Sequence, residues 1–211
     1  MQPTINSLSG ALSEIDRLLS LGKERVILGI VGKPGAGKST ITNHIMEYLV
    51  GKSVALFPMD GFHLSNKVLV DLGRRERKGA PDTFDTEGFA SHLGRIKNET
   101  TKDIFFPLFH REFEESYAAE GVIPAGTKLV LTEGNYLLLD SPEWENVGPH
   151  LDESWYLAPH DSTRQERLIS RHEKHGKNKD EARKWALGSD EINAEIVEST
   201  KQYATKIVIL P

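Results

Sequence analysis

The chain has 211 residues with a formal net charge of -5; 27% of the residues are charged and 38% are hydrophobic. This size and balance are typical of a single soluble domain that buries its own core. The mild negative charge offers no general attraction to nucleic acid or to an anionic membrane, and the lack of cysteine excludes disulfides and thiolate metal sites.

The chain opens with an amphipathic pattern over residues 7–21. Its apolar side chains recur at helical spacing, which predicts a helix packed on a sheet, and it lacks the basic start and unbroken apolar run of a signal peptide. No later stretch is long and apolar enough to span a bilayer. We therefore expect a cytoplasmic protein that binds neither membrane nor nucleic acid.

Short apolar runs then alternate with helical patterns. Five runs are typical of strands buried on both faces of a parallel sheet, at residues 25–31, 53–57, 128–131, 154–157 and 206–210. Helices are predicted at 39–49 and 86–97, with a long helical pair within 162–202. Strands that alternate with helices predict an α/β fold of three layers, α/β/α, around a five-stranded and mostly parallel sheet.

Two stretches fit this alternation poorly. Residues 61–127 are polar and rich in Lys, Arg, Pro and Phe, and we interpret them as an insertion that binds the acceptor. Residues 162–190 are strongly charged, and we interpret them as a helical lid. No repeat, linker or low-complexity tract divides the sequence, so residues 1–211 are expected to form one domain.

The most specific motif is GKPGAGKS at residues 32–39, between a predicted buried strand and a predicted helix. Its glycines let successive backbone N–H groups point at one anion, and the helix adds the positive end of its dipole. Lys38 can reach the β- and γ-phosphates of ATP, and Ser39 can offer its hydroxyl to Mg²⁺. The predicted nucleotide-binding residues are Gly32, Lys33, Pro34, Gly35, Ala36, Gly37, Lys38, Ser39 and Thr40. A glycine-rich turn that merely enters a helix is the alternative.

Two carboxylates come where predicted strands end. Asp60 closes the stretch SVALFPMD at 53–60, and Glu133 closes KLVLTE at 128–133. In an open parallel sheet, ligands bind beyond the carboxyl ends of the strands. Phosphoryl transfer to a hydroxyl needs a group that takes the proton and a metal that neutralises oxygen charge. We assign Asp60 as the base, and Glu133 with Ser39 as the Mg²⁺ ligands, partly through water. Polar residues that merely end a strand are the alternative.

Three segments carry a resemblance to a known family: GKPGAGKST at 32–40, MDGFH at 59–63 and LTEGNYLLL at 131–139. With them, the chain resembles the P-loop kinase family of phosphoribulokinase, uridine kinase and bacterial pantothenate kinase, from about residue 26 to the C-terminus. It looks like a branch of nucleoside and sugar kinase-like proteins, some labelled fructose transport system kinases. Residues 60–85 are also similar to the corresponding stretch of pantothenate kinase.

The resemblance implies a P-loop kinase fold with an acceptor site above the sheet. It implies that Asp60 is the catalytic aspartate and that Glu133 is the acid of the family's Glu-Gly motif near the metal. It also implies a lid whose arginines, here Arg167 and Arg171, close over the transferring phosphate. Arginine forks suit phosphate oxygens, and a solvated charged helix face is the alternative for both side chains.

The sequence departs from the family pattern at two places. Relatives often have an aspartate followed by a basic residue after the Pro-x-Phe stretch, where this chain has Phe109, His110 and Arg111. Uridine kinases usually have serine or aspartate at the position of Gly61. Both differences argue against a plain uridine kinase.

The predicted acceptor-binding residues are Asp60, His63, Arg111 and Glu133. His63 can hydrogen-bond the acceptor or cap its own loop. Arg111 and Lys78 can contact an anionic acceptor or be surface charges, and for Lys78 we favour the surface charge.

The sequence therefore predicts an ATP-dependent kinase that uses Mg²⁺ and transfers the γ-phosphate to a hydroxyl of a small metabolite: a nucleoside, a pantothenate-like compound or a sugar. The alternative is an NTPase or nucleotide switch without such an acceptor. Against it, the chain lacks the Asn-Lys-x-Asp motif of GTPases and a Ser-Gly-Gly signature after the phosphate loop. The acceptor and the oligomeric state stay open, and a homodimer is compatible with the sequence.

Overall fold

The computed structural model describes residues 2–174, 176 and 178–210. Its main sheet has six strands in the order β1-β8-β7-β2-β6-β3, and every pairing between them is parallel. The strands are β1 (Thr4–Ile5), β2 (Val26–Gly32), β3 (Val54–Pro58), β6 (Leu129–Gly134), β7 (Glu153–Leu157) and β8 (Lys206–Val208). The α/β class and the five predicted strands are confirmed. The predicted number of strands was one too low, because β1 has two residues and leaves no periodic signal.

The helices agree with the predicted ranges except near the C-terminus. They are α1 (Leu8–Leu19), α2 (Lys38–Tyr48), α3 (Asn66–Asp71), α4 (Thr86–Asn98), α5 (Asp161–Lys174), α6 (Lys179–Ala186) and α7 (Ser189–Ser199). The predicted helical pair within 162–202 was wrong, since three helices lie there. Asn178 caps α6 in a capping box with Glu181, and Gly188 precedes α7. Among the described residues, none of these helices combines the length and apolarity needed to cross a membrane.

Short 3-10 turns complete the chain: η1 (Met59–Phe62), η2 (Arg75–Arg77), η3 (Pro81–Thr83), η4 (Gly148–His150) and η5 (Lys201–Tyr203).

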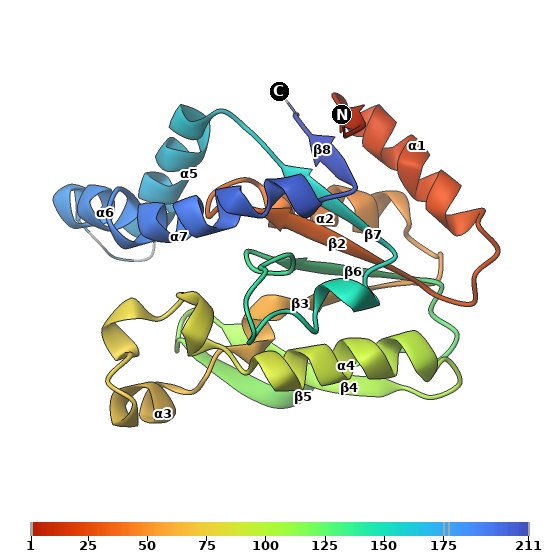
Figure 1. Cartoon of the computed structure of the whole chain (residues 1–211), viewed down its shortest axis with the longest axis horizontal. Helices are drawn as coiled ribbons and strands as arrows, with labels where there is room; N and C mark the ends of the chain where they lie inside the picture. Colours follow the sequence, from red (N-terminus) through yellow and green to blue (C-terminus); the bar gives the residue numbers. More distant parts are fainter. Residues whose placement is uncertain (1, 175, 177, 211) are drawn as a thin grey trace.

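Helices cover both faces of the main sheet, which confirms the three-layer arrangement (Figure 1). Because successive side chains of a strand point to opposite faces, β2 contributes Ile27 and Val31 to one core and Leu28 and Ile30 to the other. The second core contains buried side chains of α1 and α2, and the first contains those of α4. The chain termini lie near each other, beside β8 and α1 (Figure 1).

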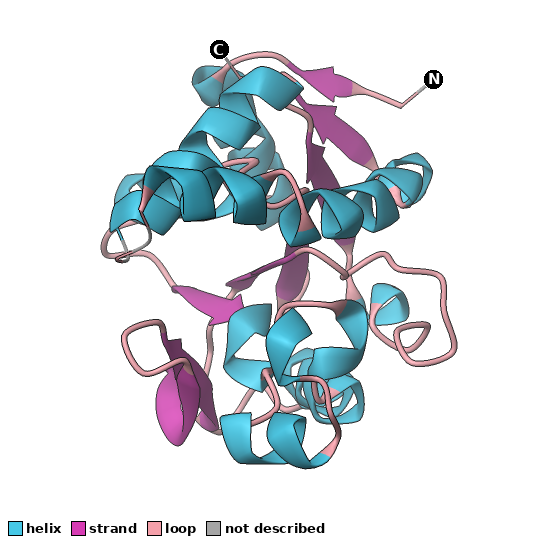
Figure 2. Ribbon diagram, turned by 90° about the vertical axis from the view of Figure 1, so that its left-hand side faces the viewer, coloured by secondary structure: helices cyan, strands magenta, loops and turns pink. Residues whose placement is uncertain are grey.

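A separate antiparallel hairpin, β4 (Ile104–His110) with β5 (Glu115–Ile123), lies within the predicted insertion. Figure 2 shows it apart from the main sheet. The sequence pattern did not predict these two strands. β4 contains a register shift between Phe106 and Leu108, and β5 is exposed along residues 117–120, with Ala119 at a φ of 59°. Such irregularities remove the alternation that identifies a strand.

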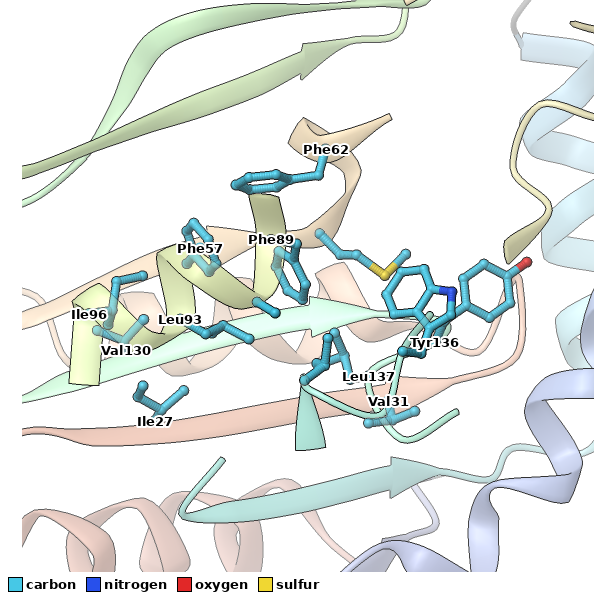
Figure 3. Close-up of a cluster of buried hydrophobic side chains, with 14 of the residues drawn as sticks. Ile27, Val31, Phe57, Phe62, Phe89, Leu93, Ile96, Val130, Tyr136 and Leu137 are labelled. Atoms are coloured by element: carbon cyan, nitrogen blue, oxygen red, sulfur yellow. The ribbon is translucent and has the colours of Figure 1, made fainter. Parts of the chain in front are cut away.

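An aromatic cluster attaches this insertion to the sheet. The rings of Phe57 and Phe89 stack with centroids 5.3 Å apart, and Phe106 meets Phe57 edge-on at 5.0 Å. Figure 3 shows the cluster, in which Phe62 lies beside Phe57 and Phe89, and the Tyr136 hydroxyl points out at one end. Because β3, η1, α4 and β4 all contribute side chains, the cluster holds η1 firmly at the end of β3.

Candidate active site

The predicted site residues meet at the carboxyl edge of three adjacent strands. β6 lies between β2 and β3, and Glu133 is in register with Ile30 of β2 and Pro58 of β3. The phosphate loop follows β2, and Asp60 follows β3 in η1. The strand order therefore places Glu133 between the phosphate loop and Asp60.

The backbone of the phosphate loop requires glycine at two positions. Gly35 has a φ of +79° and Gly37, the N-cap of α2, a φ of +93°. A side chain strains either conformation. A Cβ on Gly35 would also lie 2.5 Å from the carbonyl oxygen of Arg164 on α5. The loop is thus packed against α5 and shaped by it.

Lys38, the first residue of α2, folds back over the loop. Its Nζ donates to the Gly32 carbonyl oxygen at 2.9 Å and to Asn135 Oδ1 at 2.6 Å. Burial lowers the pKa of Lys38, while the nearby Glu133 and Asp60 charges oppose that shift. A phosphate at this place would supply the anionic partner that favours the charged ammonium. Asn135 was missed in the sequence, although it directly follows the Glu-Gly pair of the family motif.

Ser39 and Glu133 form an oxygen pair suited to a hard cation. Ser39 Oγ donates to Glu133 Oε1 at 3.1 Å. Burial raises the pKa of Glu133, and the Asp60 charge raises it further, whereas Lys38 lowers it. A divalent cation favours the ionised carboxylate, and Mg²⁺ prefers oxygen ligands of these two kinds. The residues present therefore fit a magnesium ion.

Asp60 is engaged by an arginine of the hairpin. Arg111, in the turn between β4 and β5, donates from Nη2 to Asp60 Oδ2 at 2.8 Å. A third of the Asp60 side chain and half of the Arg111 side chain remain exposed. Asp60 is thus paired with the hairpin and stays partly accessible.

The backbone explains why Gly61 departs from uridine kinases. A Cβ on Gly61 would lie 2.0 Å from the carbonyl oxygen of Pro107 in β4. Because the hairpin backbone occupies the space of a side chain, serine or aspartate would displace it.

Three arginines of α5, Arg164, Arg167 and Arg171, lie in different surroundings. Arg164 is fully buried and paired with Asp161, at 2.7 Å, and with Glu191, so it fastens α5 to α7. Arg167 Nη1 lies beside Gly37, 3.3 Å from where a Cβ would stand. Burial and the Arg111 charge lower the pKa of Arg171, and the charges of Asp190, Asp60 and Glu133 oppose that shift.

Other residues of the predicted lid also have defined positions. His172 Nε2 lies 2.7 Å from Asp190 Oδ2. His175 and Lys177, which belong to the predicted lid, lie outside the described residues.

The Lys33 side chain leaves the phosphate loop. Its Nζ donates to Asp161 Oδ1 at 2.6 Å and lies 3.1 Å from Glu198 Oε2. Lys33 therefore ties the loop to α5 and α7, and only its backbone is left for a phosphate.

His63 and Lys78 belong to the segment between η1 and α4. The His63 ring stacks on Phe84 at 4.0 Å, and burial lowers the pKa of His63 to about 4, so the ring is neutral near pH 7. Lys78 is half-buried and donates to Asn66 Oδ1 at 2.8 Å. These contacts hold the partly exposed Lys78 side chain within the insertion, and the preference for a surface charge at Lys78 stays a prediction.

A cavity of about 230 Å³ adjoins the phosphate loop. It is mostly apolar, and its lining includes Gly37, Thr40, Ile41, Pro159 and Arg167. A larger cavity of about 430 Å³ lies at the amino end of β7, and none of the predicted site residues lines it.

The fold and the site together define a P-loop nucleotide-binding protein of the α/β/α type. No protein-family model matches the chain. A Schizosaccharomyces pombe protein, provisionally named uridine kinase C227.14, is 30% identical over 198 residues, which cover 89% of this chain and 83% of that protein. A Streptococcus pneumoniae pantothenate kinase is 31% identical over 147 residues, 62% of this chain and 48% of that enzyme.

A solved structure from Silicibacter sp. TM1040 has the same fold as this chain over almost the whole length of both proteins. That protein, provisionally named a fructose transport system kinase, is 33% identical, with a TM-score of 0.86 over 95% of this chain and 98% of that one. The chain therefore belongs to the P-loop kinase family that the sequence motifs indicated. The predicted enzyme class, an ATP-dependent small-molecule kinase, is confirmed.

Proposed function

We propose that this kinase transfers the γ-phosphate of ATP to a hydroxyl of a nucleoside, a pantothenate-like compound or a sugar. The observation that carries the proposal is the position of Glu133, between the strand of the phosphate loop and the strand of Asp60, with Oε1 3.1 Å from Ser39 Oγ. The names of the relatives support this range of acceptors.

The nucleotide is held by the phosphate loop and α5. Backbone N–H groups of residues 32–40 bind the phosphates at the start of α2, where the helix dipole is positive. Lys38 exchanges its carbonyl and amide partners for phosphate oxygens. The nucleobase of ATP occupies the apolar cavity beside Thr40 and Arg167. Arg171, whose charge interacts with those of Asp60 and Glu133, contacts the transferring phosphate.

Asp60 positions and deprotonates the acceptor. The acceptor oxygen forms a bond to the γ-phosphorus, and the bond between that phosphorus and the oxygen bridging to the β-phosphate breaks. The hydroxyl proton passes to the Asp60 carboxylate, and ADP leaves with the bridging oxygen. Ser39 and Glu133 would hold Mg²⁺, which neutralises phosphate oxygen charge when bound.

The two stretches that did not fit the alternation of strands and helices also have roles in the proposed reaction. Residues 61–127 form the acceptor-binding insertion, because Arg111 from its hairpin reaches Asp60. Residues 162–190 act as the lid, and the buried Arg164 pairs anchor its first turn against α7.

The test measures ADP release with Mg²⁺ and ATP, with and without each compound of a hydroxylated-metabolite panel. We expect release that depends on an acceptor. Lys38→Ala should lose most turnover, about 100-fold or more, because it removes an ammonium from the phosphates. Asp60→Asn should keep nucleotide binding and lose transfer to a similar extent.

Matched controls separate these effects from general damage. Lys52→Ala and Asp16→Asn change exposed residues of the same types outside the insertion and the lid, and they should leave turnover unchanged. ATP hydrolysis at the same rate with and without every acceptor would instead indicate an NTPase or switch. An unchanged transfer rate in Asp60→Asn would remove Asp60 as the base.

A further inference from the structure

The acceptor side of Asp60 carries a cation that already contacts the proposed base. Arg111 Nη2 lies 2.8 Å from Asp60 Oδ2, and half of the Arg111 side chain is exposed. A guanidinium offers five N–H donors in a planar fork, so Arg111 can bind a further anion while it lies beside Asp60. An acceptor hydroxyl must share or displace this contact before Asp60 can take its proton.

A second cation borders the same space. Lys78 Nζ lies 5.3 Å above the ring centroid of Phe109 and donates to Asn66 Oδ1 at 2.8 Å and to the Glu114 carbonyl oxygen. Within the described part of the chain, no carboxylate oxygen lies within 4 Å of this ammonium. The direct partners of Lys78 are therefore neutral oxygens, while the Glu115 and Glu114 carboxylates act on it from a longer distance, and the ammonium can also donate to an anion.

The floor between these cations is aromatic and neutral. The His63 ring lies 4.0 Å from Phe84 and 4.9 Å from Phe109, centroid to centroid. Lys78 lies over the Phe109 ring, which is next to His63, and Arg111 contacts Asp60 three positions before His63, so both cations lie near this ring. Since His63 is neutral near pH 7, the ring adds no charge of its own to this space.

Arg171 adds a third cation from the lid side. Burial lowers the pKa of Arg171, the Arg111 charge lowers it further, and the charges of Asp190, Asp60 and Glu133 oppose that shift. Bound nucleotide phosphates can use Arg171, whereas Arg111 belongs to the insertion and contacts Asp60.

We propose that the acceptor is a small anionic alcohol, whose carboxylate or phosphate ester lies a few bonds from the reacting hydroxyl. Arg111 binds that anionic group, with Lys78 beside it, while Asp60 receives the hydroxyl hydrogen. The aromatic floor of His63, Phe84 and Phe109 carries the acceptor's apolar part. The inference rests on the proposed kinase function and makes Arg111 the residue that determines acceptor specificity.

The experiment compares acceptors that differ only in charge. The pairs are glycerate with glyceramide, pantothenate with panthenol, and a pentose 5-phosphate with the free pentose; the first two probe a carboxylate and the third a phosphate. ADP release is measured with Mg²⁺ and ATP. We expect the anionic member of at least one pair to have a kcat/KM about tenfold higher or more, as a charge-assisted hydrogen bond provides.

Two variants assign this preference to Arg111. In Arg111→Gln the ratio of anionic to neutral kcat/KM should fall toward one. In Arg17→Gln, which changes an exposed arginine of α1 paired with Glu14 and outside the insertion, the ratio should stay as in the wild type. Because Arg111 is half-exposed, its replacement should leave the fold intact, which circular dichroism checks.

Binding of the same pairs, measured by calorimetry with a non-hydrolysable ATP analogue present, separates the two proposals. Binding of the anionic members, lost in Arg111→Gln, without transfer would support the anion site and count against the kinase function. Transfer to neutral and anionic members at equal rates, or a ratio unchanged by Arg111→Gln, would overturn the anion inference and leave the kinase function standing. Neither binding nor transfer across all pairs would overturn both.

Discussion

Glu133→Gln should inactivate the enzyme and stabilise its ligand-free fold. The change removes the proposed carboxylate ligand of Mg²⁺ and keeps the shape of the side chain. Because a metal-ligand position is lost, we expect kcat/KM to fall about 100-fold or more. Burial raises the pKa of Glu133 above its ordinary value of 4.5, so the fold favours the neutral form. Ionisation at neutral pH therefore costs folding free energy, which glutamine avoids.

The gain should be about 1 kcal/mol, the size usual when a strained functional group is relieved. For a chain of 211 residues this corresponds to a rise in Tm of about 2–4 °C. The upward direction of the Glu133 pKa shift also predicts a pH dependence of this gain in stability. The gain should be present at pH 7 and vanish as the pH falls through 4.5, where the Glu133 carboxyl is protonated in both the folded and the unfolded state. Differential scanning calorimetry at pH 7 and pH 4 without nucleotide, with ADP release in parallel, measures both effects.

Glu47→Gln is the matched control, since three quarters of the Glu47 side chain is exposed, and it should change neither Tm nor turnover. A lower Tm for Glu133→Gln at pH 7 would refute the reasoning. It would mean that attraction to Lys38 outweighs the burial cost of the carboxylate.

Three further predictions concern the surroundings of the site. Arg171→Gln should lower kcat about tenfold or more while the KM for ATP changes less, because the Arg171 charge interacts with those of Asp60 and Glu133 and is proposed to act on the transferring phosphate; a change confined to KM would contradict the lid assignment. Gly61→Ser should destabilise the fold by about 2–4 kcal/mol in urea unfolding, because its Cβ meets the Pro107 carbonyl oxygen; a tolerated serine would show that the hairpin moves freely. The folded state keeps His63 neutral down to pH about 4, whereas the unfolded chain protonates it below 6.5. About 2–3 kcal/mol of folding stability should therefore be lost as the pH falls from 6.5 to 4, and His63→Phe should lose less. An equal loss in His63→Phe would show that another group causes the pH dependence.

The regular elements and the phosphate loop could be predicted because their signals are local. The loop is one run of eight residues whose glycines have positive φ where the backbone turns, and the buried strands are short apolar runs. The hairpin β4–β5 could not be predicted, since its exposed residues and register shift break the strand pattern. The C-terminal helices were counted wrongly because helical periodicity continues across the turn before α7.

The site beyond the phosphate loop was predicted through motifs, and its contacts came from the fold. Asp60 and Glu133 were identifiable as acids at strand ends, but nothing local showed that Arg111, 51 positions after Asp60, would hold that carboxylate. Asn135 lies 97 positions from the Lys38 ammonium that it binds. The three arginines of α5 share one helical face in the sequence, and packing against α7 and the phosphate loop gave each a different partner.

The sequence by itself determined that this chain binds a nucleotide phosphate tail, because the groups that do so are consecutive backbone amides and the lysine beside them. Only the tertiary structure decided which side chains lie around the phosphate loop. The parallel order of β2, β6 and β3 places Glu133 between the loop and Asp60, and the hairpin delivers Arg111 from the far side. Such contacts depend on the packing of elements distant in sequence, which periodicity and local motifs do not encode.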